Sequence, residues 1–252
     1  MASKLNHLLM NMNPQGLVFS SWLKRQGYSD QLQKQYRDSG WLTMLSPGVM
    51  YRTGSTLSAY SALATYNYQT GSQNRIAAHS ALEYAGFNHY VPMGKPRLAV
   101  AMTSTKRRPK WMNDEMFDVA FRPFYTDAYP TPEVILKEDS HGLLYVSSPE
   151  QAFLECLLLA KKYYDYMDLY YIMEQLTTLR SDVLQRLLET TKSFSAKRMF
   201  LYMAEKAQHY WLDELDLNRI DFGSSKIQLV VGGTYCSKYK ITIPQTLAEY
   251  EG

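Results

Sequence analysis

The chain has 252 residues, of which 46% are hydrophobic and 20% charged, a composition typical of a globular protein and not of a disordered one. No run of eighteen apolar residues occurs, which argues against a membrane-spanning helix. The first residues lack the apolar core of a secretory signal. Cys156 and Cys236 belong to no motif, so we expect unpaired thiols and a cytoplasmic protein.

The net charge of +3 is unevenly distributed along the chain. Residues 1–110 contain 13 Lys and Arg against 3 Asp and Glu, whereas residues 111–252 contain 14 against 21. A basic first half joined to an acidic second half favours contact between the first half and nucleic acid. Charge alone does not indicate that a particular base sequence is read.

The first 54 residues predict three helices followed by a β-hairpin. The helices are expected at residues 4–12, 17–26 and 29–39, and the strands at residues 41–45 and 49–52, around the turn Ser46-Pro47-Gly48. Ser29 is the expected N-cap of the third helix and Gly40 ends it. This order of elements is that of a winged helix-turn-helix, which reads double-stranded DNA.

The third of these helices has two different faces. Leu32 and Tyr36 lie four residues apart and are expected to face inward, while the opposite face carries Gln31, Lys34, Gln35 and Asp38. Glutamine pairs with adenine, and lysine or arginine reaches phosphate or guanine. An ordinary solvated helix is the competing interpretation. The DNA-contacting residues predicted here are Gln31, Lys34, Gln35 and Arg37, with Arg52 from the wing.

Helices and strands alternate in the middle of the chain, after a break at Gly54. We expect helices at residues 58–68 and 73–85, and strands at 98–104, 117–125, 134–137 and 143–146. The densest positive charge follows the first of these strands and predicts a phosphate-contacting loop formed by Lys106, Arg107 and Arg108. A solvated loop is an equally good interpretation.

The last hundred residues predict a helical segment and a terminal β-hairpin. Ser148, Pro149 and Gln151 form a capping-box pattern that begins a helix reaching residue 161. Further helices are expected at residues 165–176, 181–190 and 195–211, and a hairpin turning at Gly232-Gly233 joins residues 226–231 to 234–243. The predicted fold class is α+β, with a winged helix-turn-helix at 1–54 and a mixed α/β domain at 55–252.

No catalytic or metal site is expected. His79 and Glu83 lie four residues apart on one helix, but the second histidine of a zinc-protease helix is missing, so a polar surface pair is the better interpretation. Asp165 and Asp168 lie near a helix start, where carboxylates are favoured by the helix dipole. The chain has no P-loop, dinucleotide fingerprint or nucleophile elbow, and no cofactor is predicted.

The winged helix-turn-helix, the segment SSPEQAFLECL and the late stretch GGTYCSKYKITIP occur in this order, and together they resemble the AbiEi family of bacterial antitoxins. The resemblance implies a transcriptional regulator from an abortive-infection, type IV toxin–antitoxin system. Such a protein represses its own promoter, at inverted repeats, and neutralises a nucleotidyltransferase-like toxin without a stable complex. Its C-terminal domain carries the antitoxin activity.

No motif fixes the antitoxin residues. The candidates are cations expected to be exposed, namely Lys161, Lys162, Lys197, Arg198, Lys238 and Lys240. Two other functions stay open. One is a non-enzymatic interaction module whose acidic C-terminal half docks a basic partner, and the other is an enzyme with an unrecognised site in the C-terminal domain.

Overall fold

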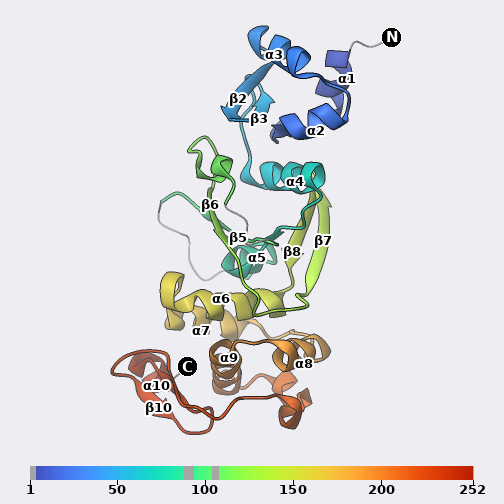
Figure 1. The fold of residues 1–252 in the computed structure, drawn as a ribbon. Coiled ribbons are helices and arrows are strands. Elements are labelled where there is room, and N and C mark those ends of the chain that lie inside the picture. The colour runs from blue at the N-terminus through green and yellow to red at the C-terminus, as the bar shows by residue number, and fades with distance from the viewer. Residues whose placement is uncertain (1–3, 88–93, 104–107, 252) are drawn as a thin grey trace. The chain divides into compact units, whose positions relative to one another are not determined.

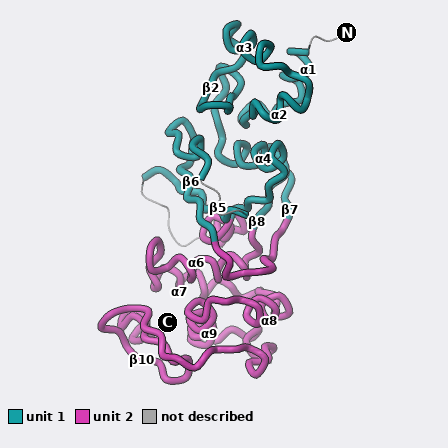
Figure 2. The backbone as a smooth tube through the Cα atoms, in the orientation of Figure 1, with its two compact units in different colours: residues 1–76, 92–125, 136–146 teal, residues 77–91, 126–135, 147–252 magenta. Residues whose placement is uncertain are grey.

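The computed structural model describes residues 4–87, 94–103 and 108–251 as an α+β protein with three sheets (Figure 1). The chain forms two compact units (Figure 2). Unit 1 comprises residues 1–76, 92–125 and 136–146, and unit 2 comprises residues 77–91, 126–135 and 147–252. A compact unit is not the same as an independently folding domain, so the division expected at Gly54 remains a prediction.

Unit 1 begins with the predicted winged helix-turn-helix. Its helices are α1 (Lys4–Asn11), α2 (Ser20–Arg25) and α3 (Asp30–Asp38), and its small sheet has the order β1 (Val18–Phe19), β3 (Val49–Arg52), β2 (Leu42–Ser46). Both neighbouring pairs in this sheet are antiparallel. The expected three helices and wing hairpin are confirmed.

The helix expected at residues 17–26 starts later than predicted. Val18 and Phe19 form strand β1, paired with Met50 and Val49, and α2 begins only at Ser20. A β-branched residue followed by an aromatic one fits a pleated strand better than a helix. The apolar periodicity of this stretch therefore came from two successive elements, each of which buries its own side chains.

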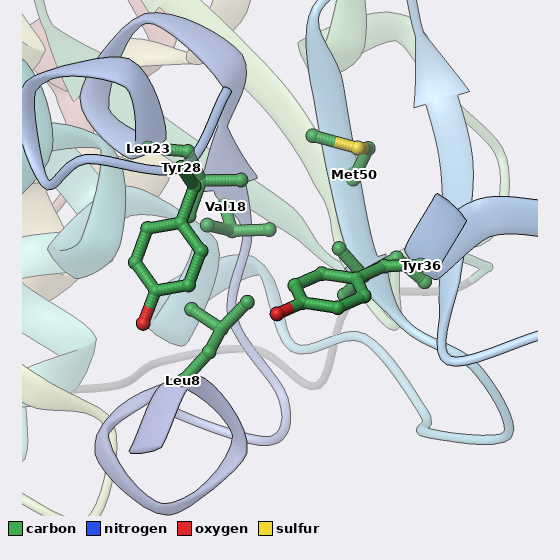
Figure 3. Close-up of a cluster of buried hydrophobic side chains, with 7 residues drawn as sticks. Leu8, Val18, Leu23, Tyr28, Tyr36 and Met50 are labelled. Atoms are coloured by element: carbon green, nitrogen blue, oxygen red, sulfur yellow. The ribbon is translucent and has the colours of Figure 1, made fainter. Parts of the chain in front are cut away.

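One apolar cluster holds the three helices on the sheet (Figure 3). Leu8 comes from α1, Leu23 from α2, Tyr36 from α3 and Met50 from β3, and each is at most 6% exposed. Their side chains, together with Val18, Tyr28 and Leu42, bury apolar surface that none of these short helices could bury alone.

Helix α4 (Ala59–Thr70) attaches to the free edge of β1 through side chains. The Gln69 amide accepts a hydrogen bond from Phe19 N (2.8 Å) and donates one to Leu17 O (2.8 Å), so it takes the place of a neighbouring strand. Thr65 Oγ1 accepts another from Leu17 N (3.0 Å). A Cβ on Gly16 would lie 2.6 Å from Thr65 Cγ2, so only glycine permits this approach. The winged fold thus has a fourth supporting helix.

The central sheet has the strand order β6-β5-β4-β8-β7. Its strands are β4 (Arg75–Ile76), β5 (Arg97–Ala101), β6 (Ala120–Phe124), β7 (Val134–Asp139) and β8 (Gly142–Ser147). Strand β4 is parallel to β8 and antiparallel to β5. Because β4 occupies residues 75–76, the helix predicted at 73–85 is shortened to α5 (Ala78–Tyr84).

Unit 2 contains the predicted helices. These are α6 (Pro149–Tyr163), α7 (Tyr166–Gln175), α8 (Ser181–Thr190) and α9 (Phe194–Lys206). Ser148 caps α6, but Gln151 does not complete the capping box, because Ser148 N donates to Glu133 O (3.0 Å) and the Gln151 amide donates to buried Glu155 (3.1 Å). The helix expected to reach residue 211 ends at Lys206 and is followed by a 3-10 turn, Tyr210–Glu214.

The terminal sheet has the order β10 (Thr234–Cys236), β11 (Ile241–Ile243), β9 (Ile227–Gln228), and a short helix α10 (Gln245–Glu249) follows it. A terminal hairpin is present, but it turns at residues 237–240. The chain does turn at residues 231–232, but the hairpin predicted around Gly232-Gly233 is wrong, because β9 and β10 do not pair with each other. Strand β9 runs parallel to β11. A Cβ on Gly233 would lie 2.0 Å from Ile243 O, so this glycine permits a close backbone approach and not a two-residue turn.

Two cations of α9 anchor the segment that leads to this sheet. Lys197 and Arg198 are each 1% exposed. Lys197 Nζ donates to Asp221 O (2.8 Å), and the Arg198 guanidinium donates to the carbonyl oxygens of Phe222, Gly223, Ser225 and Lys240. Their prediction as exposed cations is therefore wrong: both satisfy buried backbone carbonyls.

We predict that Gln69→Leu lowers the free energy of unfolding by about 2 kcal/mol, because it leaves the edge of β1 without hydrogen-bond partners. Urea denaturation measures the loss. Gln15→Leu, at an exposed position of the same unit, is the matched control and should change stability little. Equal stability of the two variants would show that α4 does not support the winged fold.

We also predict that Arg198→Met costs about 3 kcal/mol of stability, because it removes the donors from several buried carbonyl groups. Thermal and urea unfolding provide the measurement. Arg219→Met removes an ion pair with Glu189 whose arginine side chain is 63% exposed, and it should cost less than about 1 kcal/mol. A reversed order of these two losses contradicts the assignment.

Candidate nucleic-acid interface

Helix α3 is built as the sequence predicts. Ser29 caps it, with Oγ accepting a hydrogen bond from Leu32 N (3.2 Å), and Asp30 lies in its first turn. Tyr36 is buried in the core and Leu32 packs against that core. The Ser29 cap and the acidic first turn therefore fix where this helix starts, and its apolar side chains fix which of its faces turns toward the core.

The face of α3 that points away from the core is polar and exposed. Gln31, Lys34, Gln35 and Asp38 are all exposed, as expected. Gln31 and Gln35 are one turn apart, with Lys34 beside them. This face offers amide groups that can read base edges and an ammonium group for phosphate, while Asp38 adds one negative charge at its C-terminal end.

A buried amide that the sequence reading missed fixes α3 relative to α2. Gln33 is 1% exposed, and its Oε1 accepts from Ser20 Oγ (2.7 Å) while its Nε2 donates to Tyr28 O (2.8 Å). Ser20 starts α2 and Tyr28 lies in the turn, so Gln33 joins all three parts of the motif. The sequence does indicate that Gln33 is buried, because Gln33 lies three residues before Tyr36 and so on the same, core-facing side of the helix.

The wing connects to the same motif. Its strands shift register between Met44 and Ser46, and Gly48 at the turn has a φ of +77°. Gly48 O accepts a hydrogen bond from Ser20 N (2.9 Å), which ties the wing turn to the start of α2. A bulge and a tight glycine turn orient the tip of a hairpin by backbone geometry alone.

The other predicted DNA contacts occupy different environments. Arg52, at the end of β3, is exposed. Arg37 is half-buried, with Nη1 3.6 Å from Met50 Sδ, so part of its side chain packs on the wing. Arg108 donates from Nη2 to Met112 O (3.1 Å) and Phe121 O (3.0 Å). Lys106 and Arg107 lie outside the described residues.

Of the six predicted antitoxin cations, four are exposed and two are buried. Lys161 and Lys162 are exposed in the last turn of α6. Lys238 is exposed and pairs with Glu205, and Lys240 is exposed with a φ of +52°. Lys197 and Arg198 are buried, and burial lowers the pKa of both side chains. The two buried cations support the fold and are not available to a partner.

The carboxylates and histidines considered for catalysis have structural partners. His79 Nδ1 lies 3.4 Å from Glu83 Oε1, the polar pair expected from the sequence. Asp165 caps α7 by accepting from Met167 N (2.7 Å). Among the described residues, no group of three or more His, Cys, Asp or Glu side chains is arranged to hold a metal ion. The helices described include none long and apolar enough to span a membrane.

The charge asymmetry follows the two compact units. Unit 1 contains 15 Lys and Arg against 7 Asp and Glu, whereas unit 2 contains 12 against 17. The exposed face of α3 therefore belongs to a basic unit, which attracts phosphate at long range. A basic unit with an exposed amide-bearing helix and a short wing is a candidate double-stranded DNA interface.

Comparison with known proteins agrees with this geometry. Residues 1–93 match the family described as "Transcriptional regulator, AbiEi antitoxin N-terminal domain", and residues 95–244 match "Transcriptional regulator, AbiEi antitoxin, Type IV TA system". Among solved structures, the chain is similar to the RV2827C protein from Mycobacterium tuberculosis, with a TM-score of 0.63 and 15% identity. That similarity covers 94% of this chain and 88% of the other, and it supports the fold alone.

A comparison with curated protein sequences found no match. The two family matches together cover most of the chain, including both the winged motif and the helical segment. The chain belongs to the AbiEi family of antitoxin transcriptional regulators from type IV toxin–antitoxin systems.

Proposed function

We propose that this protein represses its own toxin–antitoxin operon by binding the promoter through its winged helix-turn-helix. The observation that carries the proposal is the exposed face of α3, formed by Gln31, Lys34 and Gln35 and held in place from behind by Gln33. Membership of a family of transcriptional regulators supports the same function.

In the proposed complex, α3 lies in the major groove. Gln31 and Gln35 are separated by one helical turn, about 6 Å, which is close to the rise of two base pairs and suits two nearby adenines. Lys34 contacts phosphate, and Arg37 reaches phosphate or guanine from its position beside Met50. These contacts fix the register of the helix and the bases that it reads.

The wing and the remaining cations add affinity along the DNA backbone. The turn Ser46-Pro47-Gly48 and Arg52 contact the neighbouring backbone, and the positive charges of Lys106, Arg107 and Arg108 add further attraction to phosphate. Because phosphate contacts release counterions, affinity should fall steeply with salt. Inverted repeats in the promoter would bring two winged motifs to one operator.

We further propose that DNA reading belongs to residues 1–54, supported by α4, and that residues 55–252 neutralise a nucleotidyltransferase-like toxin in the cytoplasm without forming a stable complex. Family membership supports an antitoxin role. The exposed candidates for that role are Lys161, Lys162, Lys238 and Lys240.

A second candidate function has one observation in its favour. Unit 2 carries an excess of acidic residues, 17 against 12 basic ones, which would suit docking of a basic protein partner. In that case the winged fold would bind protein and not DNA. The family assignment favours the DNA-binding function over this alternative.

The test is a mobility-shift titration of two variants with promoter DNA. Lys34→Ala should weaken binding to all sequences and reduce the slope of log affinity against log salt by about 1, because one phosphate contact is lost. Gln35→Ala should cost about 1–3 kcal/mol on the promoter and relax the preference for adenine at one position, because that side chain reads a base.

The matched control is Lys161→Ala, which removes an exposed lysine from α6 of unit 2. It should leave DNA affinity and salt slope unchanged. Circular dichroism and urea unfolding establish that all three variants keep their fold. Wild-type affinity in both Lys34→Ala and Gln35→Ala would show that α3 is not the DNA-reading helix.

A further inference from the structure

Two large apolar side chains of the winged domain and its supporting helix are strongly exposed, and neither belongs to α3. Met10 of α1 is 82% exposed and Tyr68 of α4 is 78% exposed. Tyr68 packs against Trp22 of α2, with ring centroids 6.4 Å apart. An exposed apolar patch such as the one that Tyr68 forms with Trp22 marks an interaction surface in a folded protein.

Tyr68 and Trp22 each line one of two adjoining grooves. The larger, with a volume of ≈ 710 Å³, is lined by α4 and by β7, β8 and the turn between them, including Tyr68 and Glu138. The smaller, of ≈ 330 Å³, is lined by α1 and α2, including Lys4 and Trp22. Asn11 lines both grooves. The grooves therefore form one surface, which we call the α1–α4 face, with Asn11 near its middle.

The charges on the α1–α4 face identify the partner that fits it. Across the described residues that line both grooves, only Lys4 and Glu138 carry a full charge, one in each groove. The unit that bears them is otherwise strongly basic, with 15 Lys and Arg against 7 Asp and Glu. Most approaches between two copies of this unit are therefore repulsive, and this nearly neutral face is an exception.

We propose that the α1–α4 face binds a second copy of the same chain in a two-fold symmetric dimer. A two-fold interface uses the same patch on both copies, so the patch must be complementary to itself. With the axis near Asn11, Lys4 of one protomer lies opposite Glu138 of its partner. The same rotation brings Tyr68 of each protomer against the α1–α4 face of the other.

This inference does not depend on DNA binding. It rests on three features that occur together: an exposed tyrosine packed on Trp22, the two grooves that these rings line, and one charge of opposite sign in each groove. The dimer leaves the exposed residues of α3 uncovered, because none of Gln31, Lys34 and Gln35 lines either groove. A dimer of this kind could therefore exist free in solution.

Sedimentation equilibrium of the full chain over a wide concentration range, without DNA, tests the proposal. The wild-type protein should show a reversible monomer–dimer equilibrium. Tyr68→Glu should raise the dimer dissociation constant about tenfold or more, because it buries a carboxylate in the interface. The matched control Tyr210→Glu changes a tyrosine of unit 2 that is 64% exposed and should leave the equilibrium unchanged.

Charge exchange provides a second, independent test. Lys4→Glu and Glu138→Lys should each weaken the dimer about threefold, since like charges then face each other at the ends of the interface. The double variant carrying both changes should regain wild-type dimerisation. A monomeric wild-type protein, an unaffected Tyr68→Glu dimer, or a double variant no better than the single ones would overturn the proposal.

Discussion

The winged domain depends on hydrogen bonds from two buried glutamine side chains to backbone groups. Gln33 links α3 to the start of α2 and to the turn between them. Gln69 supplies both a donor and an acceptor to the outer edge of β1, which is only two residues long. An amide left without partners in a core costs several times what a satisfied one contributes, so these contacts hold the motif in one arrangement.

These amides bear directly on function. A recognition helix reads bases only if its position relative to the rest of the motif is fixed, because base contacts are sensitive to small displacements. Gln33 lies between Gln31 and Gln35 along α3 but points the other way, into the core. The same helix therefore carries the surface proposed to contact DNA and the side chain that holds that surface in place.

Sequence periodicity predicted most elements because their apolar side chains face a core at regular spacing. The caps Ser29 and Ser148 marked helix starts correctly. Three errors have a common cause, which is long-range contact. Strand β1 forms because β3 lies beside it, Gly233 is required by Ile243 O, and Arg198 is buried by carbonyl groups more than twenty residues away.

The sequence likewise predicted the exposed side chains of the candidate site but not the contacts that hold them in place. Exposure of Gln31, Lys34 and Gln35 follows from helical periodicity alone. The half-buried state of Arg37 depends on Met50, and one hydrogen bond of Arg108 depends on Phe121; both partners lie on other elements, thirteen residues further along the chain, so no local pattern indicates them. Local patterns predicted the surface of α3, whereas its attachment required the three-dimensional structure.

The central claim is that the winged domain reads the promoter of its own operon. Its most direct test is a mobility-shift titration of the wild-type protein against that promoter and a scrambled DNA of equal length, at two salt concentrations. We expect tight binding to the promoter that weakens as salt rises, and much weaker binding to the scrambled DNA. Equal, weak affinity for both DNAs would show only generic charge attraction and would contradict the claim.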